Sequence, residues 1–227
     1  MSCSQYEGIF ITFEGIDGSG KSTQLELLAD KMDDLYWKDT TKTIPKYVST
    51  REPGGTPLAD QLRAMIKYHK PDAEKMTDFT ELMLILCARA QHVANVITPA
   101  LNRGEIVLCD RFTDSTLAYQ KYGRDRMLDM RTLYEAMEGV TPDVTFLIDI
   151  SLEERAKRIL ARDGASAVDR LESMDNEFHK RVREGYLSIA RSHKNRIMVL
   201  DGSHSVEELH KEIIQHLATE FDMSYLL

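Results

Sequence analysis

The part of this chain best equipped for chemistry is the octapeptide Gly-Ile-Asp-Gly-Ser-Gly-Lys-Ser, which begins at Gly15. It fits the pattern of Gly, four free positions, Gly-Lys, and then Ser or Thr. The glycines, Gly15, Gly18 and Gly20, let the backbone turn so that several N–H groups point inward. In such a loop Lys21 contacts the β- and γ-phosphates of a nucleotide, and the Ser22 hydroxyl holds Mg²⁺. The octapeptide therefore predicts a nucleoside triphosphate site.

The segments on either side of the octapeptide are those that must position it. Residues 9–13, Ile-Phe-Ile-Thr-Phe, are typical of a buried parallel strand. Four apolar residues then recur at helical spacing: Leu25, Leu28, Met32 and Leu35. A loop between a strand and a helix N-terminus lies where the helix dipole favours anions. The alternative, a glycine-rich turn that only connects the two elements, is disfavoured by this context.

Composition limits the classes of protein to which the chain can belong. With 227 residues, 42% of them hydrophobic, it can bury the core of one α/β domain covering residues 1–227. A formal charge of −8 disfavours a nucleic-acid partner and favours small anions held at a local basic site. The three cysteines are widely spaced and have no metal-binding pattern, which is typical of reduced thiols. We expect a cytoplasmic protein without a membrane span or signal peptide.

Polar residues follow two further predicted strands. Residues 106–110 form an apolar run that ends in Asp110, and P-loop enzymes place such an acid near Mg²⁺. Arg111 follows directly, although an Asp-Arg pair at a strand end can also be a simple surface ion pair. A short strand near residues 46–50 leads into Arg51 and a pair of glycines. Open α/β sheets bind ligands at this carboxyl edge.

The spacing of apolar residues also predicts where helices begin and end. We expect the first helix to end at residues 33–34, and the polar stretch 36–45 to be a loop insertion of unknown role. A helix over 57–68 comes next, and a longer one runs from Asp78, as N-cap, to Ile97 before Pro99. This helix carries Arg89, for which the pattern alone favours an exposed position over a ligand contact.

The last third of the chain predicts a lid and completes the sheet. Residues 144–150 and 197–200 are strands, and capping boxes over 151–154 and 205–208 begin helices after them. Basic residues flank a segment of small residues, and we interpret about 158–172 as a lid that closes over phosphates. A solvated helix face is the alternative for each arginine taken singly. The alternation of strands and helices predicts a doubly wound, five-stranded parallel sheet with helices on both faces, of the P-loop NTPase type.

Four segments in order, residues 13–23, 51–56, 89–93 and 110–120, together resemble the thymidylate kinase family. The resemblance extends over nearly the whole chain. It implies transfer of a phosphoryl group from ATP, with Mg²⁺, to dTMP, giving dTDP for dTTP biosynthesis without a covalent intermediate. It also implies a homodimer.

The resemblance assigns roles to individual residues. Those implied for ATP are Gly15, Gly18, Ser19, Gly20, Lys21, Ser22, Thr23 and Arg158. Those implied for dTMP are Asp17, Arg51, Arg89, Arg111, Ser115, Thr116 and Tyr119. The implied Mg²⁺ ligands are Ser22 and Asp110, and the implied catalytic residues are Lys21, Asp17, Asp110, Arg111, Arg162 and Arg170. In these roles Arg51 and Arg111 hold the acceptor phosphate, Arg89 donates to thymine O4, and Tyr119 packs against the deoxyribose.

Two positions depart from the family pattern. Ile85 stands where the family usually has a phenylalanine that stacks on thymine, so a broader deoxynucleoside monophosphate kinase is an alternative. Gly18 stands where one branch of the family has a catalytic arginine, so the lid must supply that charge. Its candidates are Arg158, Arg162 and Arg170, without an order among them. A nucleotide-dependent switch protein is disfavoured, because the chain has a second set of arginines and no Asn-Lys-x-Asp element.

Overall fold

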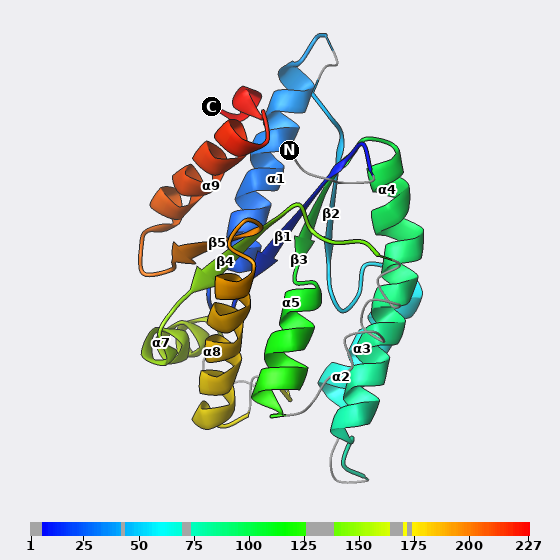
Figure 1. Ribbon diagram of the computed structural model, residues 1–227, viewed down its shortest axis with the longest axis vertical. Coiled ribbons are helices and arrows are strands. Elements are labelled where there is room, and N and C mark those ends of the chain that lie inside the picture. The colour runs from blue at the N-terminus through cyan, green and yellow to red at the C-terminus, as the bar shows by residue number, and fades with distance from the viewer. Residues whose placement is uncertain (1–5, 42–43, 70–73, 126–138, 164–169, 172–173) are drawn as a thin grey trace.

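Five parallel strands form the centre of the protein, in the order β2-β3-β1-β4-β5 (Figure 1). This computed structural model describes residues 6–41, 44–69, 74–125, 139–163, 170–171 and 174–227. The strands are β1 (Ile9–Glu14), β2 (Tyr47–Arg51), β3 (Ile106–Asp110), β4 (Val144–Asp149) and β5 (Ile197–Asp201). The predicted doubly wound, five-stranded parallel sheet is confirmed.

The strand register places the carboxyl ends of three strands side by side. Phe13 pairs with Asp110 of β3, and Asp110 pairs in turn with Arg51 of β2. Phe13 also pairs with Phe146 on the other side of β1. Because parallel strands share a direction, the loops that follow β1, β2 and β3 all leave the sheet at this one edge.

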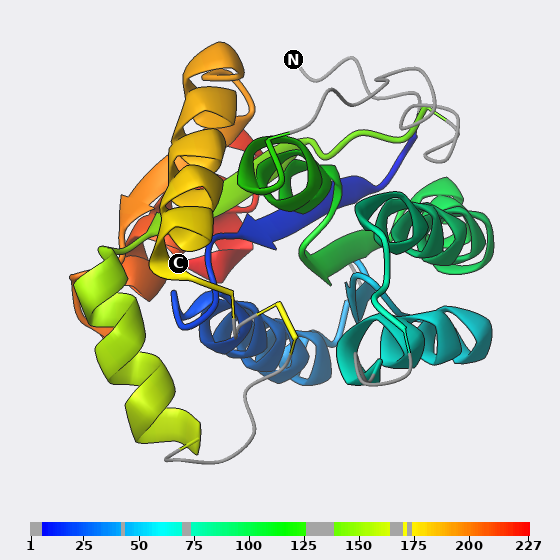
Figure 2. The ribbon, with the colours of Figure 1, turned by 90° about the horizontal axis from the view of Figure 1, so that it is seen from below.

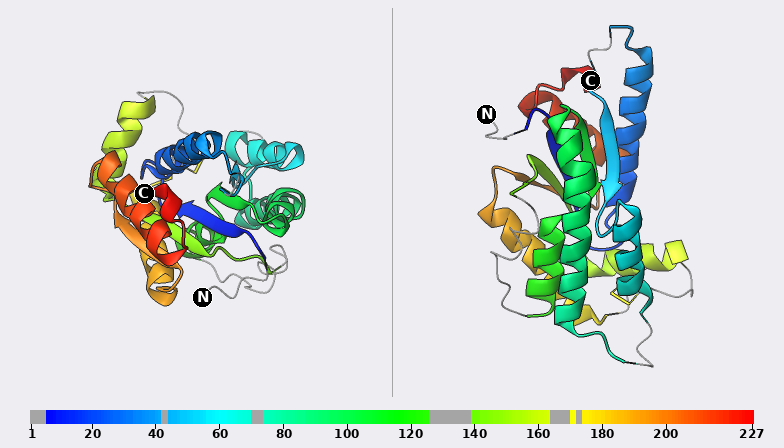
Figure 3. Two further views of the ribbon diagram at one scale, coloured as in Figure 1. Left: turned by 90° about the horizontal axis from the view of Figure 1, so that it is seen from above. Right: turned by 90° about the vertical axis from the view of Figure 1, so that its right-hand side faces the viewer.

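Helices cover both faces of the sheet (Figure 3). On one face α1 (Lys21–Lys38) and α9 (Val206–Glu220) pack with the short η3 (Ser224–Leu226). The other face is covered by α8 (Asn176–Ser192) and by two continuous segments. They are α3 (Asp78–His92) with η1 (Val93–Ile97) and α4 (Thr98–Asn102), and α5 (Thr113–Thr116) with η2 (Leu117–Gly123). Outside these layers α2 (Pro57–Tyr68) packs on α3, and α7 (Leu152–Asp163) projects beside α8 (Figure 2).

Helix α1 is longer than its sequence predicted. It continues to Lys38 instead of ending at residues 33–34, so the beginning of the polar stretch 36–45 is helical. No glycine or proline interrupts these residues. Lys38 also lies 3.3 Å from Asp34 one turn earlier, an i,i+4 pairing that favours helix. Residues 42–43 of the predicted insertion lie outside the described part of the chain.

Helix α3 differs from the prediction at both ends. Thr77, one residue before Asp78, is the N-cap, because its hydroxyl accepts from the Thr80 N–H at 3.1 Å. At the other end Pro99 does not terminate the helix. The chain widens into the π turn η1, in which the Thr98 N–H donates to the Val93 carbonyl, and then continues as α4. Proline is compatible with a helix where such a turn changes the backbone hydrogen bonding.

Within the described residues, only Asp78–Asn102 is long and apolar enough to cross a membrane by length and composition, with a mean hydropathy of 1.2. A core helix of a folded protein passes the same test. Here Glu81, Arg89 and His92 are buried in polar contacts with other segments, and Val93 and Ile97 pack on the sheet. With 39% of its apolar window buried, the segment contributes both apolar and polar side chains to the interior of the fold.

Candidate active site

The loop between β1 and α1 is shaped by its glycines. Gly15 has a φ of 145°, and a Cβ atom there would lie 2.5 Å from the Ile148 carbonyl oxygen, so any larger residue would displace the backbone. Gly20, with a φ of 97°, begins α1 without a side-chain cap. The first N–H groups of α1 are therefore left for a ligand, as the phosphate-loop prediction requires. The Ser19 hydroxyl is buried and has no hydrogen-bond partner among the described residues.

Two charged side chains of this loop lie close together. The Lys21 Nζ is 3.9 Å from Asp17 Oδ1, and both side chains are mostly buried. Burial alone would raise the pKa of Asp17, but the charges of Arg111 and Lys21 and a hydrogen bond from Tyr119 outweigh it and hold that pKa below its usual range. Asp17 is thus a fixed negative charge. Burial, followed by the charge of Arg111, lowers the pKa of Lys21.

Ser22 and Asp110, the two residues predicted to bind Mg²⁺, are in contact with each other. The Ser22 hydroxyl donates to Asp110 Oδ2 across the junction of α1 and β3. The other carboxylate oxygen, Asp110 Oδ1, is buried and has no hydrogen-bond partner in the described part of the chain. One hydroxyl and one carboxylate beside a phosphate loop fit Mg²⁺, which takes few protein ligands and completes its shell with phosphate and water. No group of three or more His, Cys, Asp or Glu residues that could hold a metal occurs in the described segments.

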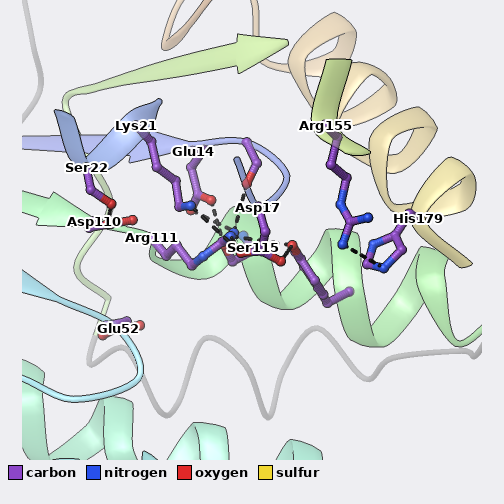
Figure 4. Close-up of polar contacts among 12 residues, drawn as sticks. Glu14, Asp17, Lys21, Ser22, Glu52, Asp110, Arg111, Ser115, Arg155 and His179 are labelled. Carbon is purple, nitrogen blue, oxygen red and sulfur yellow. Dashed lines mark hydrogen bonds and ion pairs between the residues drawn. The ribbon is translucent and has the colours of Figure 1, made fainter. Parts of the chain in front are cut away.

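Arg111 lies at the centre of the site (Figure 4). Its backbone adopts a φ of 72°, which is uncommon for a residue with a side chain and turns the chain sharply after β3. Nη1 donates to the Gly15 carbonyl at 2.9 Å, to Ser115 Oγ at 3.1 Å and to the Tyr186 hydroxyl at 2.9 Å. Nη2 donates to Asp17 Oδ1 at 2.6 Å. The phosphate loop and the segment after β3 are thereby joined.

A cavity of about 230 Å³ opens at this edge of the sheet. All seven residues predicted for dTMP line it: Asp17, Arg51, Arg89, Arg111, Ser115, Thr116 and Tyr119. So do four residues predicted for phosphates, metal or the lid: Lys21, Ser22, Asp110 and Arg162. The cavity also has apolar walls, one of which is Ile85. One space therefore contains both a phosphate-loop lysine and a second set of arginines.

Arg89 is buried with 2% of its side chain exposed, contrary to the exposed position that its pattern favoured. Its Nε donates to Glu52 Oε2 at 2.7 Å, and its Nη2 donates to Thr116 Oγ1 at 2.8 Å. The remaining nitrogen, Nη1, is buried and has no hydrogen-bond partner among the described residues. Arg89 also lines the cavity, so a wall residue of the cavity carries a donor that no described residue satisfies.

Sequence reasoning missed the residues that support Arg89. Glu52 is 3% exposed and holds both Arg89 and the Nδ1 of His92, which lies 3.0 Å away. It directly follows Arg51, and only the arginine of that pair was identified as a ligand. Gln120, which also lines the cavity, donates to Glu81 Oε1 at 2.9 Å. It belongs to a segment that resembles the family, but no local pattern predicts its partner.

The three candidate lid arginines take different positions. Arg162 on α7 lines the cavity. Arg158 donates to the Gly202 carbonyl at 2.8 Å and to the Ser19 carbonyl at 3.3 Å, behind the phosphate loop. Arg170 forms an ion pair with Glu81 and is not among the residues that line the cavity. Residues 164–169 and 172 of the predicted lid 158–172 lie outside the described residues. Thr23 is exposed in the first turn of α1.

Comparisons with known proteins show the family to which the chain belongs. Residues 13–213 match the family model described as thymidylate kinase. The curated thymidylate kinase of Geobacter sp. strain M21 is 47% identical over 208 residues, covering 88% of this chain and 87% of that protein. That of Exiguobacterium sibiricum is 40% identical over 214 residues, covering 93% and 95%. The crystal structure of thymidylate kinase from Ehrlichia chaffeensis superposes with a TM-score of 0.69 at 34% identity, covering 92% of this chain and 98% of that one. With such agreement along almost its full length, this chain belongs to the thymidylate kinase family.

Proposed function

We propose that this protein transfers the γ-phosphoryl group of ATP to dTMP, giving dTDP and ADP in the supply of dTTP. The observation that carries the proposal is the single cavity in which Lys21 and Arg111 lie on either side of Asp17. A kinase needs the donor and acceptor phosphates next to each other, and most of its catalysis is positioning and charge neutralisation.

On the donor side the residues from Gly15 to Thr23 hold the triphosphate. Backbone N–H groups at the start of α1 donate to the phosphate oxygens, and Lys21 compensates charge on the β- and γ-phosphates. Ser22 and Asp110 would hold Mg²⁺, which when bound neutralises charge on the phosphates of the donor. Arg158 contacts the back of the loop and supports it through the Ser19 carbonyl.

On the acceptor side Arg51 and Arg111 hold the phosphate of dTMP. A guanidinium suits this role because it donates two parallel hydrogen bonds to a phosphate. The attacking oxygen is already anionic, so transfer needs no general base and no covalent intermediate. Arg162, which lines the cavity, and Arg170 complete charge compensation and water exclusion when the segment around α7 closes.

The base is recognised by hydrogen bonding and by shape. Arg89 Nη1 suits the O4 acceptor of thymine and is mismatched against the amino donor of cytosine. Thr116 lies beside Arg89, and Tyr119 packs against the deoxyribose with Ser115 nearby. Ile85 lines the cavity without a ring to stack on the base, an observation that favours a second candidate function, a broader deoxynucleoside monophosphate kinase.

We also propose a cytoplasmic homodimer of one-domain chains. Apolar side chains are exposed on the outer helices: Leu58, Met65 and Tyr68 on α2, and Phe79 on α3. Large apolar side chains exposed on two helices that pack on each other favour a second copy of the chain as their partner. The free thiols of Cys87 and Cys109 agree with a reducing compartment.

The decisive experiment measures ADP release with ATP, Mg²⁺ and each of dTMP, dUMP, dCMP, dGMP, dAMP and UMP. We expect the highest kcat/KM with dTMP, a usable but lower value with dUMP, and very little turnover with dCMP. ADP release that is independent of any added monophosphate would contradict the kinase proposal. Comparable turnover of dTMP and dCMP would favour the broader kinase.

A further inference from the structure

Glu14, the last residue of β1, lies directly behind Arg111 and does not line the cavity. It is completely buried. Its Oε1 accepts from the Phe112 N–H at 2.7 Å and from the Ser115 N–H at 3.2 Å. Its Oε2 accepts from the Ser115 hydroxyl at 2.6 Å and from the Tyr186 hydroxyl at 2.9 Å. Each of these four hydrogen bonds is therefore donated to the carboxylate.

The two hydroxyls also contact Arg111, and this limits where their protons point. A carboxylate only accepts hydrogen bonds and a guanidinium only donates them. A hydroxyl can therefore only donate to Glu14, and its oxygen lone pairs are left to accept from Arg111 Nη1. The two hydroxyl oxygens also lie 2.7 Å apart, so either of them can donate to the other while the second donates to the carboxylate. The two backbone N–H groups that reach Oε1 hold the start of α5, where the chain leaves the left-handed turn at Arg111.

We propose that Glu14 is a positioning residue for the acceptor site, which sets the direction of the Ser115 and Tyr186 hydroxyls so that they hold the Arg111 guanidinium in place. This inference rests on the proposed function, in which Arg111 binds the phosphate of dTMP. Glu14 does not line the cavity, so it acts on the acceptor site through Arg111 and through the start of α5, which its Oε1 holds. Glu14 makes no hydrogen bond to Lys21 or to the start of α1, so we expect the donor site to depend on it less than the acceptor site does.

The electrostatic surroundings make this role sensitive to pH. Burial, and next the charge of Asp114, raises the pKa of Glu14 to about 7, while Arg111 opposes the shift. The titratable groups that face Glu14 are Arg111, Asp114, Tyr186, Lys21 and Cys109. A protonated Glu14 becomes a donor, and a neighbouring hydroxyl must then accept its proton. The direction of one hydrogen bond between Glu14 and a hydroxyl is thereby reversed. Clamping of the acceptor should therefore strengthen as the pH rises through about 7 and weaken as the pH falls through it.

The test compares Glu14→Gln with the wild type and with a control variant, Glu105→Gln. Glu105 directly precedes β3, at the edge of the sheet opposite to the cavity, so the control makes the same chemical change away from the site. The amide keeps the shape and one acceptor oxygen, but its NH₂ group must donate to a hydroxyl and so reverses the proton direction. For Glu14→Gln we expect kcat/KM for dTMP to fall ~10-fold at pH 8, with the KM for ATP within about twofold. Its Tm at pH 8 should not fall, since the variant no longer buries a charge.

The pH profile gives a second readout. Between pH 6 and 8 the decline of kcat/KM toward acid should be shallower in Glu14→Gln than in wild type, and the titration of dTMP itself, near pH 6, is common to both. Acceptor kinetics of Glu14→Gln within twofold of wild type, or an equal loss for ATP, would overturn the inference. If Glu14→Gln does not fold, an unchanged KM for dTMP in Tyr186→Phe would overturn it instead. A wild-type protein that does not phosphorylate dTMP would refute the proposed function, a distinct result.

Discussion

Replacing Arg89 by methionine and by lysine should separate its two roles. Arg89 is 2% exposed and its partner Glu52 is 3% exposed, so the ion pair between them is buried. Methionine preserves much of the side-chain volume but removes the charge and every donor. Lysine keeps the charge close to Glu52 but loses the planar arrangement that also reaches Thr116 and the cavity.

The magnitude for stability follows from burial. Removing one partner of a buried ion pair costs about 3 to 5 kcal/mol, because the other charge is left in the interior. In a chain of this length each kcal/mol lowers Tm by roughly 2 to 4 °C, so Arg89→Met should unfold ~6 to 20 °C below wild type. In the Arg89→Met variant His92 still lies 3.0 Å from Glu52 and can hydrogen-bond to it, so we expect the decrease in Tm to be about 6 °C. Adding Glu52→Gln to Arg89→Met removes the stranded charge and should recover part of the loss.

The magnitude for activity follows from the unpaired nitrogen. A hydrogen bond to a charged donor contributes about 1.5 to 3 kcal/mol, so Arg89→Lys should lower kcat/KM for dTMP by ~10- to 150-fold. Its effect on dCMP should be much smaller, because cytosine offers no acceptor to Nη1. The ratio of kcat/KM for dTMP and dCMP should therefore fall in the lysine variant.

Calorimetry at pH 8 and steady-state kinetics with both acceptors test these two magnitudes separately. An unchanged Tm in Arg89→Met would refute the energetic argument from the buried pair. An unchanged dTMP/dCMP ratio in a folded Arg89→Lys protein would refute the assignment of base recognition to this residue.

Three further predictions concern the phosphates and the titrating acids. Lys21→Met should lower kcat by ~10² or more without loss of fold, as measured by turnover and circular dichroism, and near-normal turnover would end the kinase interpretation. Arg162→Ala should reduce kcat more than it raises the KM for dTMP. It should also reduce kcat more than Arg170→Ala does, because of these two arginines only Arg162 lines the cavity. An equal kcat in both variants and the wild type would contradict this prediction. Because the pKa of Glu14 is raised from 4.5 to about 7, the free energy of unfolding should decrease as pH rises across that window, and urea titrations of Glu14→Gln should show a flatter dependence.

The sheet and the phosphate loop could be predicted because each depends on local sequence. Buried parallel strands are continuous apolar runs, and the glycines before Lys21 have one common purpose. The location of Asp110 and Arg51 at one edge then follows from the parallel direction of β2 and β3. Such local patterns can be recognised without knowing which distant residues pack against them.

The partners of buried polar side chains could not be predicted, since they come from segments far apart in sequence. Nothing near Arg89 indicates that Glu52, 37 positions away, holds it in the core. The same applies to Glu81, which binds Arg170 across 89 positions and so places that arginine away from the cavity wall. The predicted helix ends were wrong for a related reason. At Pro99 the π turn of η1 overrides a stop signal that is valid for an isolated helix.

The register that pairs Phe13 with Asp110 and Asp110 with Arg51 has a consequence for evolutionary change in this protein. Neighbouring strands are held about 4.8 Å apart by backbone hydrogen bonds, whatever side chains they carry. The separations between the phosphate loop, the Asp110 carboxylate and Arg51 are therefore inherited from the backbone. Core residues such as Leu28 and Phe146 can drift to other apolar types of similar volume, and stability will change before the spacing of the reacting groups does.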